Sequence, residues 1–193
     1  LECLVEARAV AEGLGNPRLT ATITQFLGAA RALCGDIDAG RELLDESVLM
    51  ARNLGDRYLE TFSLLYLAKL FAATGDGRAR STIEVALTYS REGNFRHHLA
   101  DGLGVLGELN LAEGAVPEAV ACLERSVQVW RTRGWIPFLA RALRTLGDAH
   151  STACDHEAAR ASWTEARELF DRIGDAAGHS SVEERLTSQD MIG

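Results

Sequence analysis

Residues 18–54, with the sequence RLTATITQFLGAARALCGDIDAGRELLDESVLMARNL, contain two stretches of helix-forming residues on either side of Gly35. In the second stretch, apolar positions recur three and four residues apart, which is the period of a helix with one buried face. Glycine ends helices readily because it adopts the left-handed backbone conformation without steric cost. The stretch therefore predicts a helical hairpin with its turn at Gly35.

Glycines at equivalent places divide the rest of the chain in the same way, with a period of about forty residues. One series consists of Gly15, Gly55, Gly93, Gly134 and Gly174, and the other of Gly35, Gly75 and Gly114, with Cys154 in the fourth place. Helical hairpins that are repeated at a fixed spacing stack into a solenoid. The sequence therefore predicts an all-α fold, an α-solenoid of about four and a half hairpins with a capping helix at its C-terminal end.

This period predicts one helical repeat domain over residues 1–193. The domain begins with a half repeat at 1–15 and ends with a cap at 176–188, in which Val182 and Leu186 lie on one side. Complete hairpins are expected at 18–54, 57–92, 96–133 and 137–173. Since the chain starts with half a repeat and without methionine, we expect it to be a piece of a longer protein.

The helix expected at 1–15 lacks the partner helix that its place in the repeat requires. We therefore expect its apolar face to be partly exposed. That face would contact preceding repeats in the full-length protein or pair with a second copy of the chain in a homodimer.

Small residues alternate with large ones at fixed offsets in the hairpins. First helices carry Leu27-Gly28, Leu67-Ala68, Leu106-Gly107 and Leu146-Gly147, and second helices carry small, large and small residues such as Gly40, Leu44 and Ser47. These columns resemble the tetratricopeptide repeat, in which small residues let two helices approach while the large one fills the gap. The resemblance covers nearly the whole chain and implies a right-handed solenoid. Its helices would be longer than usual, because the tetratricopeptide period is about 34 residues.

Long-helix repeats of this kind resemble the C-terminal sensor segments of large bacterial regulators, namely the AfsR-like and SARP family and the LuxR-type, ATPase-linked transcriptional regulators. The most similar stretch contains residues 146–150, 155–160, 168–170 and 173–175. The resemblance implies a protein-interaction and sensing module, which binds a partner segment or effector and passes a change to neighbouring domains.

Charge and hydropathy exclude several classes of partner. The net charge of −8 should repel nucleic acid and anionic membrane surfaces. No apolar run is long enough to span a membrane and no secretory signal is present, so we expect a cytoplasmic location. Four scattered cysteines without a CxxC pair argue against disulfides and zinc, and we expect them to be reduced and mostly buried.

Motifs for catalysis are missing from the sequence. Neither a GxSxG elbow, an HExxH helix nor a GxxxxGK[ST] loop occurs, and the GxGxxG pattern at 102–107 falls inside an expected helix. Gly107 in this pattern is already explained as a packing position. We therefore expect no catalytic residue and no cofactor.

Histidine and cysteine residues do not form a ligand set either. His97 and His98 are adjacent, so on a helix they point in different directions, and we expect them at the surface. His150, Cys154 and His156 are not completed by a carboxylate, so no metal site is expected.

Groove-lining residues follow from the resemblance, because the first helices line the concave face of tetratricopeptide superhelices. One row would contain Gln25, Leu65, Gly104 and Arg144, with Arg141 one turn away, and a second row would contain Ala29, Lys69, Glu108 and Asp148. We expect this groove to bind a protein or peptide segment, which could come from other domains of the same regulator. Two local alternatives stay open: Arg144 and Asp148 pair with each other at helical spacing, and Gly104 is either a ligand-admitting depression or a packing position.

Three functions are compatible with these patterns. The first is the interaction and sensor module of a bacterial transcriptional regulator. A stand-alone peptide or small-molecule receptor is the second, and it needs an enclosed pocket near Gly104, Glu108 and Arg144. An enzyme domain is the third, and the sequence offers it no reactive group.

Overall fold

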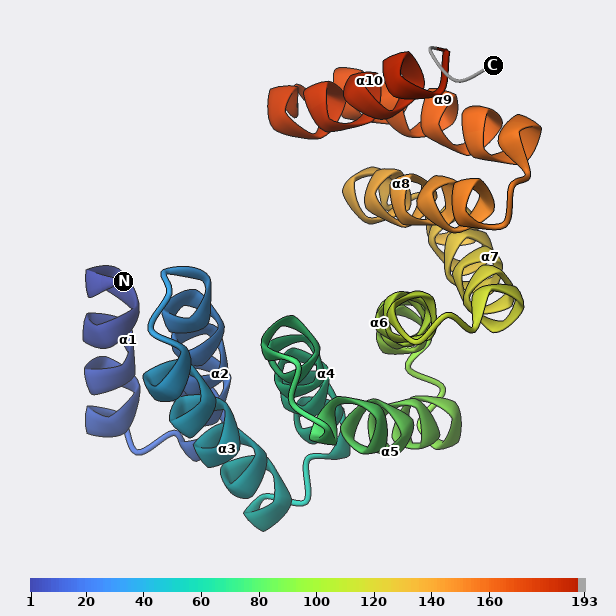
Figure 1. Ribbon diagram of the computed structural model, residues 1–193. Coiled ribbons are helices and arrows are strands. Elements are labelled where there is room, and N and C mark those ends of the chain that lie inside the picture. The colour runs from blue at the N-terminus through green and yellow to red at the C-terminus, as the bar shows by residue number, and fades with distance from the viewer. Residues whose placement is uncertain (191–193) are drawn as a thin grey trace. The chain divides into compact units, whose positions relative to one another are not determined.

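The computed structural model describes residues 1–190, which form ten helices and no strand (Figure 1). The all-helical fold expected from the sequence is thus confirmed. The helices are α1 (Glu2–Gly13), α2 (Pro17–Leu33), α3 (Ile37–Asn53), α4 (Arg57–Thr74), α5 (Arg78–Glu92), α6 (Arg96–Ala112), α7 (Val116–Arg133), α8 (Ile136–Thr152), α9 (His156–Ile173) and α10 (Ala176–Asp190).

The turns between helices contain the left-handed residues that the glycine series predicted, with one exception. Gly35 has a φ of +90°, and Cys154, which stands in a glycine position, has a φ of +60°. At the end of α5 the prediction was wrong, because Gly93 stays right-handed with a φ of −84° and Asn94 has a φ of +52°. Asparagine tolerates this conformation better than most side chains, so it can replace glycine in such a turn.

Contacts divide the chain into two compact units, Leu1–Gly102 and Leu103–Gly193. The division falls inside α6, next to the glycines at 102, 104 and 107. Two of these glycines are sites of close packing, since a Cβ atom on Gly102 would lie 2.9 Å from Leu87 and one on Gly107 2.6 Å from Leu123.

In the first unit, α1 packs on α2, α2 on α3, α3 on α4, and α4 on α5. Helices α2 and α3 approach very closely, since a Cβ atom on Gly28 would lie 3.0 Å from the Cγ atom of Leu44. A Cβ atom on Gly40 would lie 2.9 Å from the carbonyl oxygen of Gly28. The small and large residues that recur at fixed offsets in the sequence therefore form the contact between these two helices.

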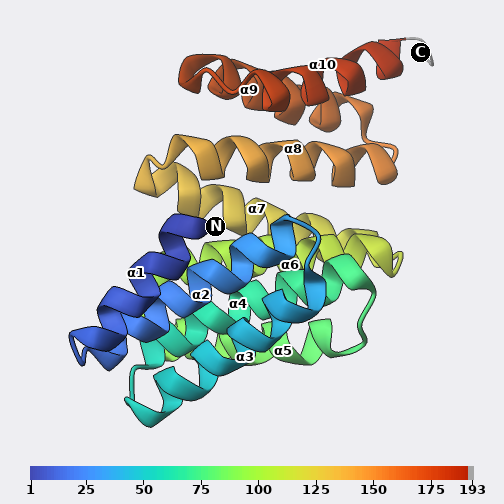
Figure 2. The ribbon, with the colours of Figure 1, turned by 90° about the vertical axis from the view of Figure 1, so that its left-hand side faces the viewer.

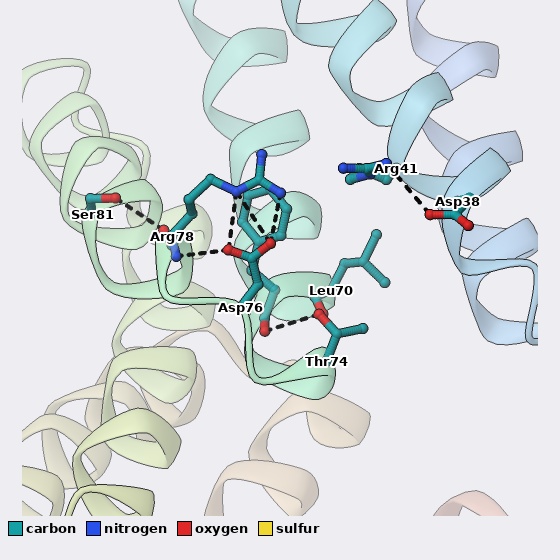
Figure 3. A network of polar contacts seen from close by, with 8 residues as sticks. Asp38, Arg41, Leu70, Thr74, Asp76, Arg78 and Ser81 are labelled. Atoms are coloured by element: carbon teal, nitrogen blue, oxygen red, sulfur yellow. Dashed lines mark hydrogen bonds and ion pairs between the residues drawn. The ribbon is translucent and has the colours of Figure 1, made fainter.

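The turn between α4 and α5 is held by one short polar network, which Figure 3 shows. The backbone N–H of Arg78 donates to Asp76 Oδ1 over 2.9 Å, and its guanidinium Nη2 donates to Oδ2 over 2.6 Å. These hydrogen bonds lower the pKa of the Asp76 carboxyl to about 2. They help to start α5, whose N-cap residue, Gly77, has no side chain to cap it.

In the second unit, α7 packs on α8, α8 on α9, and α9 on α10 (Figure 2). A Cβ atom on Gly107 would lie 2.6 Å from Leu123 Cγ, and one on Gly147 would meet the indole of Trp163. Val182 and Leu186 of α10 are buried.

Surface properties match the predictions only in part. Val5 and Val10 of α1 are exposed, and the sequence predicted a partly exposed apolar face for this helix. The cysteines were predicted to be mostly buried, and this was wrong: Cys3, Cys34 and Cys154 are exposed, and Cys122 is half-buried. Both Cys34 and Cys154 lie in turns: Cys34 directly follows the end of α2, and Cys154 stands in a glycine position. Within residues 1–190, we find no helix whose length and apolar character would let it span a bilayer.

Candidate partner-binding surface

One face of α4 carries a line of large side chains. Tyr58, Phe62 and Tyr66 follow one another at four-residue spacing, and Lys69 lies one turn further on. Residues three and four apart share a face of a helix, so these four side chains form one stripe, which we name the α4 stripe. Tyr58 is 38% exposed, and the other three are half-buried.

Helix α2 extends this surface with another aromatic ring. Phe26 is 40% exposed, and its ring centroid lies 6.2 Å from that of Phe62 at an angle of 86°. The rings of Phe62 and Tyr66 are 5.2 Å apart. Edge-to-face and tilted arrangements of this kind are favourable for aromatic pairs. Two helices of the first unit therefore present a continuous, partly exposed aromatic surface.

The opposite side of the α4 stripe is supported by the start of α6. Tyr58 Oη and His97 Nε2 are 2.8 Å apart and share a hydrogen bond. Phe95 packs edge-on against Tyr58, with centroids 5.2 Å apart. The imidazole of His98 stacks on Phe62 at 4.9 Å and an interplanar angle of 22°.

His98 was predicted to lie at the surface, and this was wrong, since it is only 1% exposed. His97 is half-buried, and its ring lies against that of His98, with centroids 4.2 Å apart. Neither ring nitrogen of His98 has a hydrogen-bond partner. Burial, together with the neighbouring His97, lowers the pKa of His98 to about 3, so its imidazole is neutral at physiological pH.

Lys69, a predicted groove residue, ends the α4 stripe with a charged pair. Its Nζ atom lies 2.6 Å from Asp101 Oδ2 and 5.5 Å from the ring centroid of Tyr66. This end of the surface is therefore polar but locally neutral.

Two other predicted groove residues in this unit are not at the surface. Gln25 and Leu65 are fully buried, and Ser63 Oγ lies 3.3 Å from Gln25 Oε1, to which it donates. The exposed positions are the next ones along the chain, Phe26 and Tyr66. One residue turns a helix by about 100°, which is enough to move a side chain from the surface to the core.

In the second unit, Glu108 and Arg141 are exposed and Arg144 is half-buried. A Cβ atom on Gly104 would lie 3.8 Å from Ser126 Oγ of α7, so Gly104 faces a neighbouring helix at ordinary contact distance.

Asp148 does not pair with Arg144 as the helical spacing suggested. Instead it accepts hydrogen bonds from Arg185 of α10 over 2.6 and 3.1 Å, and from the indole N–H of Trp163 over 3.0 Å. The bidentate pair that Asp148 forms with the guanidinium of Arg185 is stronger than a single contact with an arginine one turn away on the same helix.

Within 1–190, no group of three or more His, Cys, Asp or Glu side chains is placed to hold a metal ion.

Comparison with known proteins gives the fold alone. No protein-family model matches the chain, and no curated protein matches it either. Among solved structures, the crystal structure of BtubC (BKLC) from P. vanneervenii is similar, with a TM-score of 0.69. The identity is 18%, over 98% of this chain and 87% of that one. The likeness supports a helical-repeat fold.

Proposed function

We propose that this chain is a protein-interaction and sensor module of a cytoplasmic bacterial transcriptional regulator, built as a right-handed, tetratricopeptide-like solenoid. The α4 stripe, with Phe26 beside it, would receive a segment of a partner protein or of another domain of the regulator. The observation that carries the proposal is the continuous aromatic surface, exposed on two packed helices.

Aromatic rings that remain partly exposed are well suited to binding. Tyrosine and other large aromatic residues are enriched among the side chains that dominate protein interfaces. Here their rings are fixed by contacts with one another, so little side-chain entropy is lost when a partner binds.

The length of the surface indicates the size of its ligand. From Tyr58 to Lys69 the helix rises by about 16 Å, at 1.5 Å per residue, which matches about five residues of extended peptide. Apolar side chains of the peptide would pack on the rings, and a polar one would lie beside Lys69 and Asp101.

Alanine substitutions test this surface. Peptides selected from a random library on the wild-type chain are expected to bind Phe26→Ala and Tyr66→Ala variants about tenfold more weakly, because each loses an aromatic contact. Calorimetric titration measures the change. Leu49→Ala is the matched control, since Leu49 is an exposed apolar residue of α3 outside the stripe. Equal affinity of all three variants and the wild type would show that the peptides bind elsewhere.

The regulatory role needs a test in the parent protein. Deleting this segment is expected to change expression of the target genes while the regulator still binds DNA through a separate domain. Unchanged regulation after the deletion would contradict the sensor role, even if the α4 stripe binds peptides.

A stand-alone small-molecule receptor is favoured by a different observation, a cavity of about 990 Å³ in the second unit. Its walls come from α8, α9 and α10 and include Asp148, Ser151, Arg160, Trp163, Glu184 and Arg185. If this function holds, a thermal-shift screen of metabolites should give compounds whose stabilisation disappears in Arg160→Ala and Glu184→Ala variants. Compounds that stabilise these variants as much as the wild type would reject the cavity as the receptor site.

A further inference from the structure

A second aromatic cluster lies where α7 turns into α8. Trp130 of α7 is buried, and its ring is stacked on both Trp135 and Phe138, with centroids 5.7 and 4.8 Å away. The two outer rings are 44% and 40% exposed, respectively. Two large aromatic side chains are therefore held at the surface by a rigid ring beneath them.

The only charged residues in the sequence segment around this cluster are arginines, although the protein as a whole is acidic. Five arginines and no Asp or Glu occur between residues 125 and 147, although the chain has a net charge of −8. Arg131 is neutralised by Glu165 of α9, with both carboxylate oxygens 2.8 Å from its Nη2. Arg133 and Arg141 are exposed.

These two arginines are close to the exposed rings along the chain. Arg133 comes two residues before Trp135, and Arg141 follows Phe138 by three residues on the same face of α8. We define the Trp135 surface as Arg133, Trp135, Phe138 and Arg141.

We infer that the Trp135 surface binds an acidic segment of a partner protein that carries an apolar side chain. The apolar side chain would pack on the indole of Trp135 and the ring of Phe138, while carboxylates pair with Arg133 and Arg141. Arginine suits this role because its planar guanidinium binds carboxylates through two parallel hydrogen bonds.

Charge distinguishes a short acidic peptide from nucleic acid at this surface. Screening limits electrostatic interactions to about 8 Å at physiological ionic strength, so a short peptide experiences mainly the local arginines. A nucleic acid carries closely spaced charges well beyond this patch and would also be repelled by the net charge of −8 on the chain. The observations therefore favour the peptide.

Intrinsic fluorescence provides the test. The probe is a peptide of about ten residues, made of Asp and Glu with one central leucine, and a lysine version of it is the charge control. The acidic peptide should change the tryptophan emission of the full chain, whereas the lysine version should not.

Charge-reversing variants identify the surface. Arg133→Glu and Arg141→Glu are each expected to weaken binding about tenfold, as is Trp135→Ala. Arg91→Glu is the matched control, because Arg91 is an exposed arginine of α5 in the first unit. All of these side chains are exposed, and thermal melting followed by circular dichroism would verify that each variant is folded.

Three results would overturn the inference. The first is that the acidic peptide causes no emission change, and the second is that Arg91→Glu weakens binding as much as Arg133→Glu does. The third is that an oligothymidine of about twelve nucleotides binds more tightly than the peptide. That result would assign the surface to single-stranded nucleic acid, whose bases stack on exposed aromatic side chains.

Discussion

A Gly147→Ala variant is expected to unfold more easily than the wild type, by about 2 kcal/mol, although alanine is the better helix former. The added methyl group would meet the indole of Trp163, which cannot move without losing its hydrogen bonds to Asp148 Oδ1 and the Arg144 carbonyl. Urea unfolding measures the loss. Tryptophan fluorescence reports it for the second unit alone, because all three tryptophans lie there.

Gly104→Ala is the matched control in the same unit. Its methyl group would lie 3.8 Å from Ser126 Oγ, at ordinary contact distance, so the gain in helix propensity should appear as up to about 1 kcal/mol of added stability. The pair of variants therefore moves stability in opposite directions. If Gly147→Ala were as stable as Gly104→Ala, the close contact between α8 and α9 would not exist as described.

Acidification is expected to destabilise the first unit through His98. The pKa of His98 is lowered from 6.5 to about 3 in the folded protein, so only the unfolded chain takes up this proton between those values. The contribution of neutral His98 is fully present above pH 6.5 and is lost as the pH falls toward 3. From pH 7 to pH 5 the loss should reach up to about 2 kcal/mol.

Comparison with His98→Phe isolates this contribution. Phenylalanine keeps a ring against Phe62 but cannot be protonated, so the variant should lose up to about 2 kcal/mol less than the wild type over the same pH interval. Tyrosine fluorescence follows the first unit, which contains all three tyrosines. The tryptophans are excited at the same time, but their emission is separated from that of tyrosine by its wavelength. Parallel pH profiles for the two proteins would contradict this prediction, because they would mean that His98 has the same pKa in the folded and unfolded protein.

The helices could be predicted from the sequence because their determinants are local. Glycine at the turns and apolar residues at helical spacing are properties of short segments, and they placed the hairpin of α2 and α3 correctly. The contact of Gly28 with Leu44 also followed from the sequence, since repeated columns reveal which residues face each other. The division of the chain inside α6 did not follow, because it depends on contacts summed over many residues.

The candidate site could be predicted only in part, because the register carried over from the tetratricopeptide resemblance does not fix which side chains of a helix are exposed. Gln25 was placed in the groove by that register, but it is buried, and Ser63 donates to its side-chain oxygen. The exposed residue is instead its neighbour Phe26, although phenylalanine is an apolar residue. A signal was nevertheless present, since the four-residue spacing of Tyr58, Phe62 and Tyr66 already marks one face of a helix.

The close fit of Gly147 against Trp163 has an evolutionary consequence. Neither residue can change alone without creating a clash or a void, so substitutions at the two sites should occur together in descendants of this chain. A smaller side chain at 163 would first make room, after which alanine or serine at 147 becomes acceptable. In an alignment of homologues, these two columns should therefore show correlated volume, with the sum kept nearly constant.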